Sequence, residues 1–246
     1  MRALIVLVAA LWGAGAGLLL PRAVHRLSVD AEQPWRADCP GGHPITGAFG
    51  GWVGRARCAV VDCARYGPNV VGVAVLTSAV CALLGAATGA RPEVAVWLVV
   101  APVAVLLALV DQRVQRLPDV LTLPLAAVTL ALLGVAAALP ADGGSWTTAL
   151  LGALALGAGY LFLHRVNPSG MGFGDVKLAL GLGAALGWYG WSTLLLGAFA
   201  GLAYGSLYGL TLIALRRASR KSAIPLGPFM IGGAFTGVLL GALAAA

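Results

Sequence analysis

The chain has 246 residues, of which 60% are hydrophobic and 10% are charged, and its formal net charge is +7 at pH 7. Soluble globular domains carry about 25% charged residues, so this composition excludes an ordinary soluble enzyme and indicates a protein that crosses a membrane several times. The positive charge would suit either nucleic acid or an anionic membrane surface, and the positions of the basic residues distinguish the two.

Eight apolar stretches are candidates for membrane-spanning helices, which need about 20 apolar residues each. They cover residues 3–20, 69–89, 93–111, 118–139, 147–164, 175–190, 192–214 and 224–244. The sixth stretch is the weakest candidate for a membrane-spanning helix, because it is short and rich in glycine. Glycines such as Gly197, Gly201 and Gly205 are expected to let helices pack closely. The fold class is therefore predicted to be all-α, a polytopic membrane helical bundle of about eight transmembrane helices.

The chain divides into three predicted parts: residues 1–21 as the first transmembrane helix, 22–68 as a small loop-rich cytoplasmic segment, and 69–246 as the helical membrane core. If the N-terminus lies outside, 14 of the 16 lysines and arginines fall on the cytoplasmic side, and only Arg2 and Arg91 lie outside. The positive-inside rule requires this asymmetry, so the net charge reflects topology and nucleic-acid binding is not expected. Cleavage of the first helix as a secretory signal would place the arginine-rich residues 22–68 outside, so a retained helix is favoured.

Three of the nine acidic residues, Asp111, Asp119 and Asp175, lie at predicted cytoplasmic helix ends. The other six, Glu93 among them, are expected in hydrated segments. A carboxylate at the membrane boundary that faces the bundle is commonly functional, although a hydrated interfacial position would explain any single one of the three. Asp175 begins a helix, where free backbone N–H groups stabilise a negative charge.

Two carboxylates at the same depth could perform aspartic-protease chemistry. One, ionised, takes a proton from water while the other, protonated, donates to the scissile carbonyl oxygen. Competing chemistries are weak, because the sequence contains neither a His-Glu-x-x-His zinc motif nor a Walker phosphate loop. We interpret His164 as an interfacial residue.

Three segments carry a family resemblance. Residues 170–179, Gly-Met-Gly-Phe-Gly-Asp-Val-Lys-Leu-Ala, resemble the G-x-G-D-x-K-L signature of the type IV prepilin leader peptidases, G-x-G-D membrane aspartic proteases. Asp111 and the run Leu-Pro-Asp-Val-Leu-Thr-Leu-Pro-Leu at residues 117–125 are similar to the family's first aspartate and the run that follows it. Residues 224–230 resemble the family's P-F-G-P-F segment, and the likeness covers about residues 95–246.

The resemblance implies a prepilin peptidase, an aspartic endopeptidase of the bacterial cytoplasmic membrane with its active site on the cytoplasmic side. Asp111 and Asp175 would be the catalytic pair, facing one another across a cleft between the third, fourth and sixth stretches, with Asp119 as the fallback member. Gly172, Gly174 and Lys177 would support the site or bind substrate. The implied partners are pilin-like precursors in the lipid bilayer, and no cofactor is needed for cleavage. The alternatives are a non-catalytic pilin-binding relative and a small multi-pass transporter, whose carboxylates would be expected nearer the midplane.

Family members with two activities also methylate the new N-terminus with S-adenosylmethionine, and they carry two C-x-x-C knuckles after the first helix. The corresponding segment here departs from that pattern, and its candidate ligands are Cys39, His43, Cys58 and Cys63. They could form a Cys₃His zinc site or be a remnant without metal, which we favour. The family's asparagine before this segment is replaced by Leu20 or Pro21. Cleavage without methylation is therefore narrowly favoured, and zinc and S-adenosylmethionine stay open, as does the oligomeric state.

Overall fold

The structure, a computed structural model, describes all residues except 31, 59, 61, 62, 64, 169, 218, 220–223 and 246. The described residues form α-helices and one isolated bridge, between Asp38 and Pro44. The helices are α1 (Arg2–Leu27), α2 (Ala48–Gly51), α3 (Val70–Thr88), α4 (Glu93–Val114), α5 (Asp119–Ala137), α6 (Trp146–Val166), α7 (Phe173–Trp188), α8 (Trp191–Ala214) and α9 (Gly227–Ala244). α2 is a single irregular turn, because Phe49 and Gly50 have positive φ angles.

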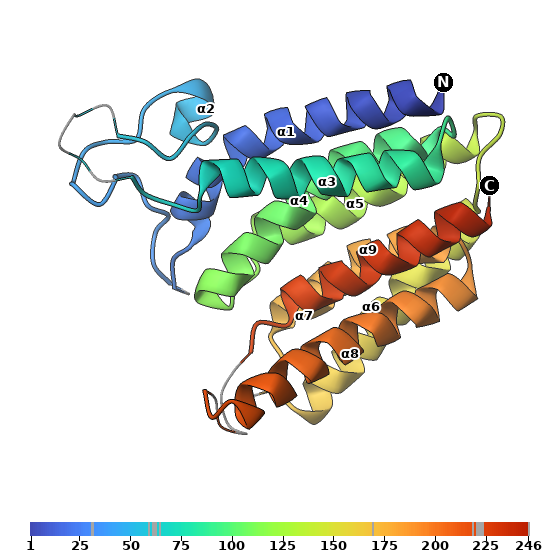
Figure 1. The fold of residues 1–246 in the computed structure, drawn as a ribbon. Helices are drawn as coiled ribbons and strands as arrows, with labels where there is room; N and C mark the ends of the chain where they lie inside the picture. The colour runs from blue at the N-terminus through green and yellow to red at the C-terminus, as the bar shows by residue number, and fades with distance from the viewer. Residues whose placement is uncertain are drawn as a thin grey trace.

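The predicted all-α membrane bundle is confirmed. Among the described residues, seven helices are long and apolar enough to cross a membrane: α1, α3, α4, α5, α6, α8 and α9. Both termini lie at one end of the bundle, and α2 with the segment around it lies at the other (Figure 1). The division into three parts stays a prediction, but α1 continues to Leu27, seven residues past the expected helix end, with Pro21 inside it.

The eighth long helix, α7, differs from the other seven. It has 16 residues, or about 24 Å at 1.5 Å per residue, which is short of the roughly 30 Å hydrocarbon layer. Almost every residue from Asp175 to Trp188 is buried, because α5, α6, α8 and α9 all pack against this helix. The short, glycine-rich sixth stretch is therefore a helix enclosed by other helices. Its length need not match the thickness of the hydrocarbon layer, because it contacts protein rather than lipid.

Close helix packing depends on glycine, as predicted. A Cβ atom on Gly183 of α7 would collide with the backbone of Gly152 in α6, so these two helices touch backbone to backbone. α8 and α9 meet in the same way, since a Cβ atom on Gly233 would collide with the backbone at Gly197 and Gly201. Without a hydrophobic drive between helices in lipid, such close contacts supply much of the association energy.

The expectation that Glu93 is a hydrated loop residue is wrong. Its side chain is fully buried at the end of the bundle that carries the termini, and it pairs with Arg91 at 3.4 Å. The Gly143 N–H and the Tyr189 hydroxyl also donate to its carboxylate, both at 3.4 Å. Arg91 in turn donates to the carbonyl oxygen of Ala242, at 2.6 Å. This polar network joins the ends of α4, α7 and α9, and a buried charge needs such partners.

Candidate active site

A cavity of about 800 Å³ lies at the end of the bundle that faces α2, where α4 ends and α5, α7 and α9 begin. The residues from α4, α5 and α7 correspond to the third, fourth and sixth stretches of the sequence, and residues 224–226 complete the wall. All six residues predicted for the peptidase site line this one cavity: Asp111, Asp119, Gly172, Gly174, Asp175 and Lys177.

Asp111 is held at the last turn of α4. α4 ends three residues later at Val114, and the capping residue Gln115 adopts the left-handed conformation with φ 49°. Asp111 is 4% exposed, and its Oδ2 accepts a hydrogen bond of 2.9 Å from the N–H of Gly227. Gly227 is the first residue of α9, and N–H groups in the first turn of a helix have no partner within it and favour anions. The segment that resembles P-F-G-P-F therefore positions Asp111.

Gly227 leaves no room for a larger residue. A Cβ atom at this position would lie 2.8 Å from Oδ2 of Asp111 and 3.1 Å from its Cγ. Glycine thus allows the start of α9 to approach the carboxylate closely enough to donate.

Asp175 is the third residue of α7. Its Oδ2 accepts a hydrogen bond of 3.1 Å from the N–H of Gly172, the residue that caps the helix, and its own N–H donates to the Gly172 carbonyl oxygen at 3.1 Å. The carboxylate is 7% exposed. The turn before α7 lies against the turn after α4, because a Cβ atom on Gly174 would come within 2.9 Å of the Leu117 Cβ atom. This contact brings the two aspartate-bearing segments together.

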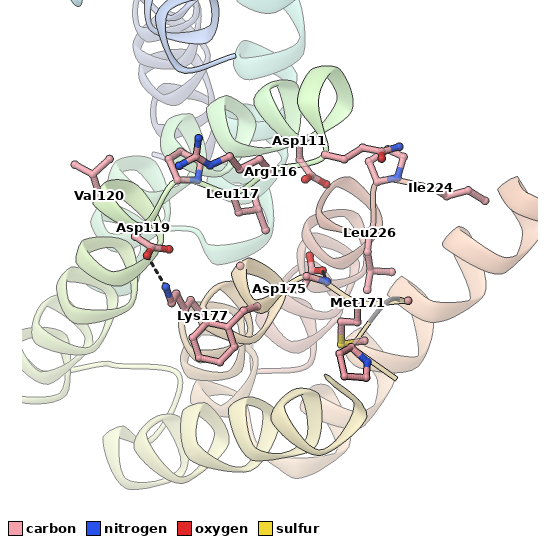
Figure 2. Close-up of a pocket in the computed structure, with 18 of the residues that line it drawn as sticks. Asp111, Arg116, Leu117, Asp119, Val120, Met171, Asp175, Lys177, Ile224 and Leu226 are labelled. Carbon is pink, nitrogen blue, oxygen red and sulfur yellow. Dashed lines mark hydrogen bonds and ion pairs between the residues drawn. The ribbon is translucent and has the colours of Figure 1, made fainter. Parts of the chain in front are cut away.

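Figure 2 shows the Asp111 and Asp175 carboxylates projecting into the cavity from α4 and from the start of α7. Asp119 lies apart from them and pairs with Lys177, whose Nζ is 2.5 Å from its Oδ2. The Asp119 side chain is 62% exposed, whereas the side chain of Lys177 is 18% exposed and its Nζ lies 4.9 Å from the centre of the Phe173 ring. Asp111 and Asp175 are therefore both buried at this cavity, whereas Asp119 has a cation as its partner.

Two residues of α6 lie near Asp175, and neither was predicted from the sequence as a residue of the site. The His164 ring nitrogen Nδ1 lies 2.8 Å from the Met171 carbonyl oxygen, and the ring packs on Phe173 with 5.5 Å between centroids. Tyr160, one turn earlier, is buried on the same side of the helix, and both residues lie within electrostatic range of Asp175. His164, partly exposed at the end of α6, thus also braces the turn before α7. The i, i+4 spacing was visible, but the pairing of α6 with α7 was not.

The segment between α1 and α3 gathers the four predicted metal ligands into one cluster. Cys39 Sγ lies 3.6 Å from Cys58 Sγ, 3.3 Å from Cys63 Sγ and 3.6 Å from His43 Nδ1, and Cys58 Sγ lies 3.5 Å from the same nitrogen. All four donor atoms lie within 4.8 Å of one another. Tetrahedral zinc with bonds of about 2.0–2.3 Å places its ligands about 3.3–3.8 Å apart, so this donor set fits a zinc ion.

The thiols of the cluster differ in acidity. Burial raises the pKa of Cys39, but hydrogen bonds from the backbone of His43 and from Cys63 lower it to about 6 overall. The hydrogen bond between the Cys63 and Cys39 thiols raises the pKa of Cys63 to about 11. Cys39 thus ionises more readily than Cys63, and thiolates are the form that binds metals.

The fold and the cavity together define a helical membrane protein with two buried carboxylates in one cavity at the end of its bundle. Residues 98–208 match the model of the type IV leader peptidase family. The chain is 30% identical to the prepilin leader peptidase/N-methyltransferase of Aeromonas hydrophila, and the alignment covers 87% of this chain and 83% of that protein. Proteins of the same name from Pseudomonas putida and Pseudomonas aeruginosa are 33% and 36% identical over 76% and 50% of this chain, and over 64% and 42% of their own lengths. No solved structure matches the chain. The chain belongs to the type IV leader peptidase family.

Proposed function

We propose that the protein is a membrane aspartic endopeptidase that cleaves the short basic leader from type IV pilin-like precursors. The observation that carries this proposal is the placement of Asp111 and Asp175, both buried, in one cavity at one end of the bundle. The family membership supports the same activity, since the relatives are named as prepilin leader peptidases.

Cleavage needs a water molecule and no nucleophilic side chain. One carboxylate, ionised, takes a proton from the water as it attacks the scissile carbonyl carbon. The other, protonated, donates to the carbonyl oxygen. Asp111 and Asp175 are each held through Oδ2 by a backbone N–H, from Gly227 and Gly172. Fixed carboxylates lose little freedom when the substrate binds, which favours the reaction.

We place the cavity on the cytoplasmic side of the bacterial membrane. It lies at the same end of the bundle as the segment between α1 and α3, whose described arginines include Arg36, Arg55 and Arg57. Basic segments stay in the cytoplasm by the positive-inside rule. Trp35 from this segment lines the cavity, and Arg116 beside the cavity donates to the Asp30 carbonyl oxygen at 2.8 Å. A basic leader would thus reach the site from the cytoplasm.

The proposal is tested by co-expressing the protein with a pilin-like precursor from the same genome and measuring the mass of the precursor. We expect loss of the leader, with a new N-terminus at the boundary of the apolar segment. The relative from Aeromonas hydrophila with its own precursor serves as the positive control. An uncut precursor beside an inserted protein would contradict the proposal. The same spectrum shows whether the new N-terminus carries a methyl group, and because Leu20 or Pro21 replaces the family's asparagine we expect none.

We further propose that the segment between α1 and α3 binds one structural zinc ion through Cys39, His43, Cys58 and Cys63. A site closed by four protein ligands stabilises the fold and leaves no open position for chemistry. The sequence alone favoured a site without metal, whereas the distances between the four donor atoms support a bound zinc ion. We expect elemental analysis of the purified protein to give about one zinc per chain, and Cys58→Ser to lose it. Cys81 lies in α3, away from this segment, so Cys81→Ser is the control. Absence of zinc after purification without chelators would contradict the proposal.

A further inference from the structure

A second cavity, of about 340 Å³, lies between α3, α4, α7 and α9. Its lining residues are apolar except for Gln112. We call it the apolar groove. Its walls belong mostly to membrane-spanning helices, so whatever occupies it must be soluble in the hydrocarbon layer.

The groove lies on the same face of α4 as Asp111. On α4 its wall includes Trp97, Ala101, Ala104 and Ala108, spaced by four, three and four residues, and Asp111 follows three residues later. Residues at this spacing lie on one face of a helix. The same face of α4 therefore forms the groove and carries Asp111.

The walls formed by α7 and α9 repeat this arrangement, and α3 forms the fourth wall. On α7, Leu182 and Ala185 lie seven and ten residues after Asp175, which places all three on one face. On α9, Ile231, Ala234 and Val238 follow Gly227, the residue that holds Asp111, by four, seven and eleven residues. Three helix faces thus converge on the aspartates.

The groove has the length and the surface for an elongated apolar partner. From Trp97 to Asp111 the chain rises about 21 Å, roughly two-thirds of the hydrocarbon thickness. Small residues on its α4 wall, such as Ala101, Ala104 and Ala108, let another helix approach closely. The cavity cannot enclose a whole helix, but it can take the side chains from one face of a helix.

We propose that the apolar groove binds the hydrophobic helix that follows the cleavage site of the precursor. The inference rests on the proposed function and names the surface that positions the substrate. A lipid chain has similar chemistry, but the α4, α7 and α9 walls are continuous with the helix faces that carry or hold Asp111 and Asp175, which fits a polypeptide that passes from the cavity into the bilayer. With its apolar helix in the groove, the substrate presents the peptide bond just before that helix to the two carboxylates.

The first experiment fills the groove with Ala104→Phe and measures two substrates in detergent micelles. One is the full precursor, and the other is a peptide that contains the leader and the cleavage site without the apolar helix. We expect cleavage of the precursor to fall at least about tenfold and cleavage of the peptide to stay within about twofold of wild type. Ala127→Phe, on an exposed position of α5, is the matched control and should change neither rate. An equal loss on both substrates would overturn the inference, because it would show that the substitution distorts the catalytic cavity.

The second experiment does not depend on a cleavage rate or on a cleavable peptide. A photo-crosslinking amino acid replaces Val100 in the groove or Leu154 on an exposed position of α6, in an Asp175→Asn background that retains the uncut precursor. We expect the crosslink to the precursor at Val100 and not at Leu154. Crosslinks to lipid alone at Val100 would overturn the inference and leave the proposed function standing. A wild-type protein that cuts no precursor would instead refute the proposed function itself.

Discussion

Replacing either Asp111 or Asp175 with asparagine is expected to abolish precursor cleavage without preventing membrane insertion. Asparagine has nearly the shape of aspartate but can neither accept a proton from water nor donate one as an acid. Loss of one acid–base group costs about 10²–10⁴-fold in rate. Groups that act as a unit are strongly non-additive, so the double variant should be no worse than either single one. Cleavage of a co-expressed precursor, followed by the shift of its band on a gel, measures the effect.

Asp119→Asn is the matched control for these substitutions. Asp119 lines the same cavity but is exposed and paired with Lys177, so its variant should retain a substantial part of the activity. Normal cleavage by Asp111→Asn together with loss of cleavage in Asp119→Asn would show that the pair is Asp119 with Asp175. Full activity in Asp175→Asn would show that the protein is not an aspartic protease.

Gly227→Ala should reduce cleavage by about 10²-fold although it adds only one methyl group. The new Cβ atom would lie 2.8 Å from Oδ2 of Asp111, and the carboxylate, as the end of a side chain, would move more easily than the backbone. A displacement of about 1 Å at a catalytic group costs about 10²-fold in rate. The initial rate of cleavage in detergent micelles measures this loss, and the melting temperature shows that the fold persists.

Gly205→Ala is the comparison for this variant. Its Cβ atom would meet the Phe229 side chain at 3.5 Å, which is ordinary van der Waals contact, between α8 and α9. We expect activity close to wild type. If Gly205→Ala and Gly227→Ala lose activity and melting temperature together, packing of α9 rather than the position of Asp111 would explain both results.

The helices and the charged residues of the cavity could be predicted from the sequence because both depend on local patterns. Apolar stretches of sufficient length identify spans, and Asp111 and Asp175 each come with a motif. Their assignment as the catalytic pair stays a prediction, which the substitutions above test. Gly227 was within a recognised segment, but its hydrogen bond to Asp111 links residues 116 positions apart, and nothing in either segment indicates that pairing.

The burial of α7 and of Glu93 could not be predicted for a physical reason. In a membrane both the lipid-facing and the protein-facing sides of a helix are apolar, so hydropathy does not show which side is enclosed. Glu93 was assigned to a loop because a charge at the end of a span is usually hydrated. Only the positions of Arg91, Gly143 and Tyr189 around it reveal the network.

For the Cys/His cluster, the sequence identifies the four candidate ligands but does not show that their donor atoms lie close together. Counting residues between cysteines suggested a degraded site, since Gly42 stands where a second cysteine was expected. The turn at Gly41 and Gly42, the latter with φ 75°, instead brings His43 Nδ1 beside Cys39 and Cys58. Spacing along the chain limits which turns are available, but the turn decides where the donor atoms lie.

The enclosure of α7 has a consequence for how the protein tolerates its membrane. When the thickness of a bilayer changes, helices that contact lipid respond by tilting or by distorting the lipid around them. α7 is surrounded by α5, α6, α8 and α9, so this adjustment falls on the outer helices first. Asp175 begins this central helix, whereas Asp111 lies on α4 and accepts a hydrogen bond from the start of α9, and both of those helices are long enough to span the membrane. A change in acyl chain length would therefore act on the position of Asp111 before it acts on the position of Asp175.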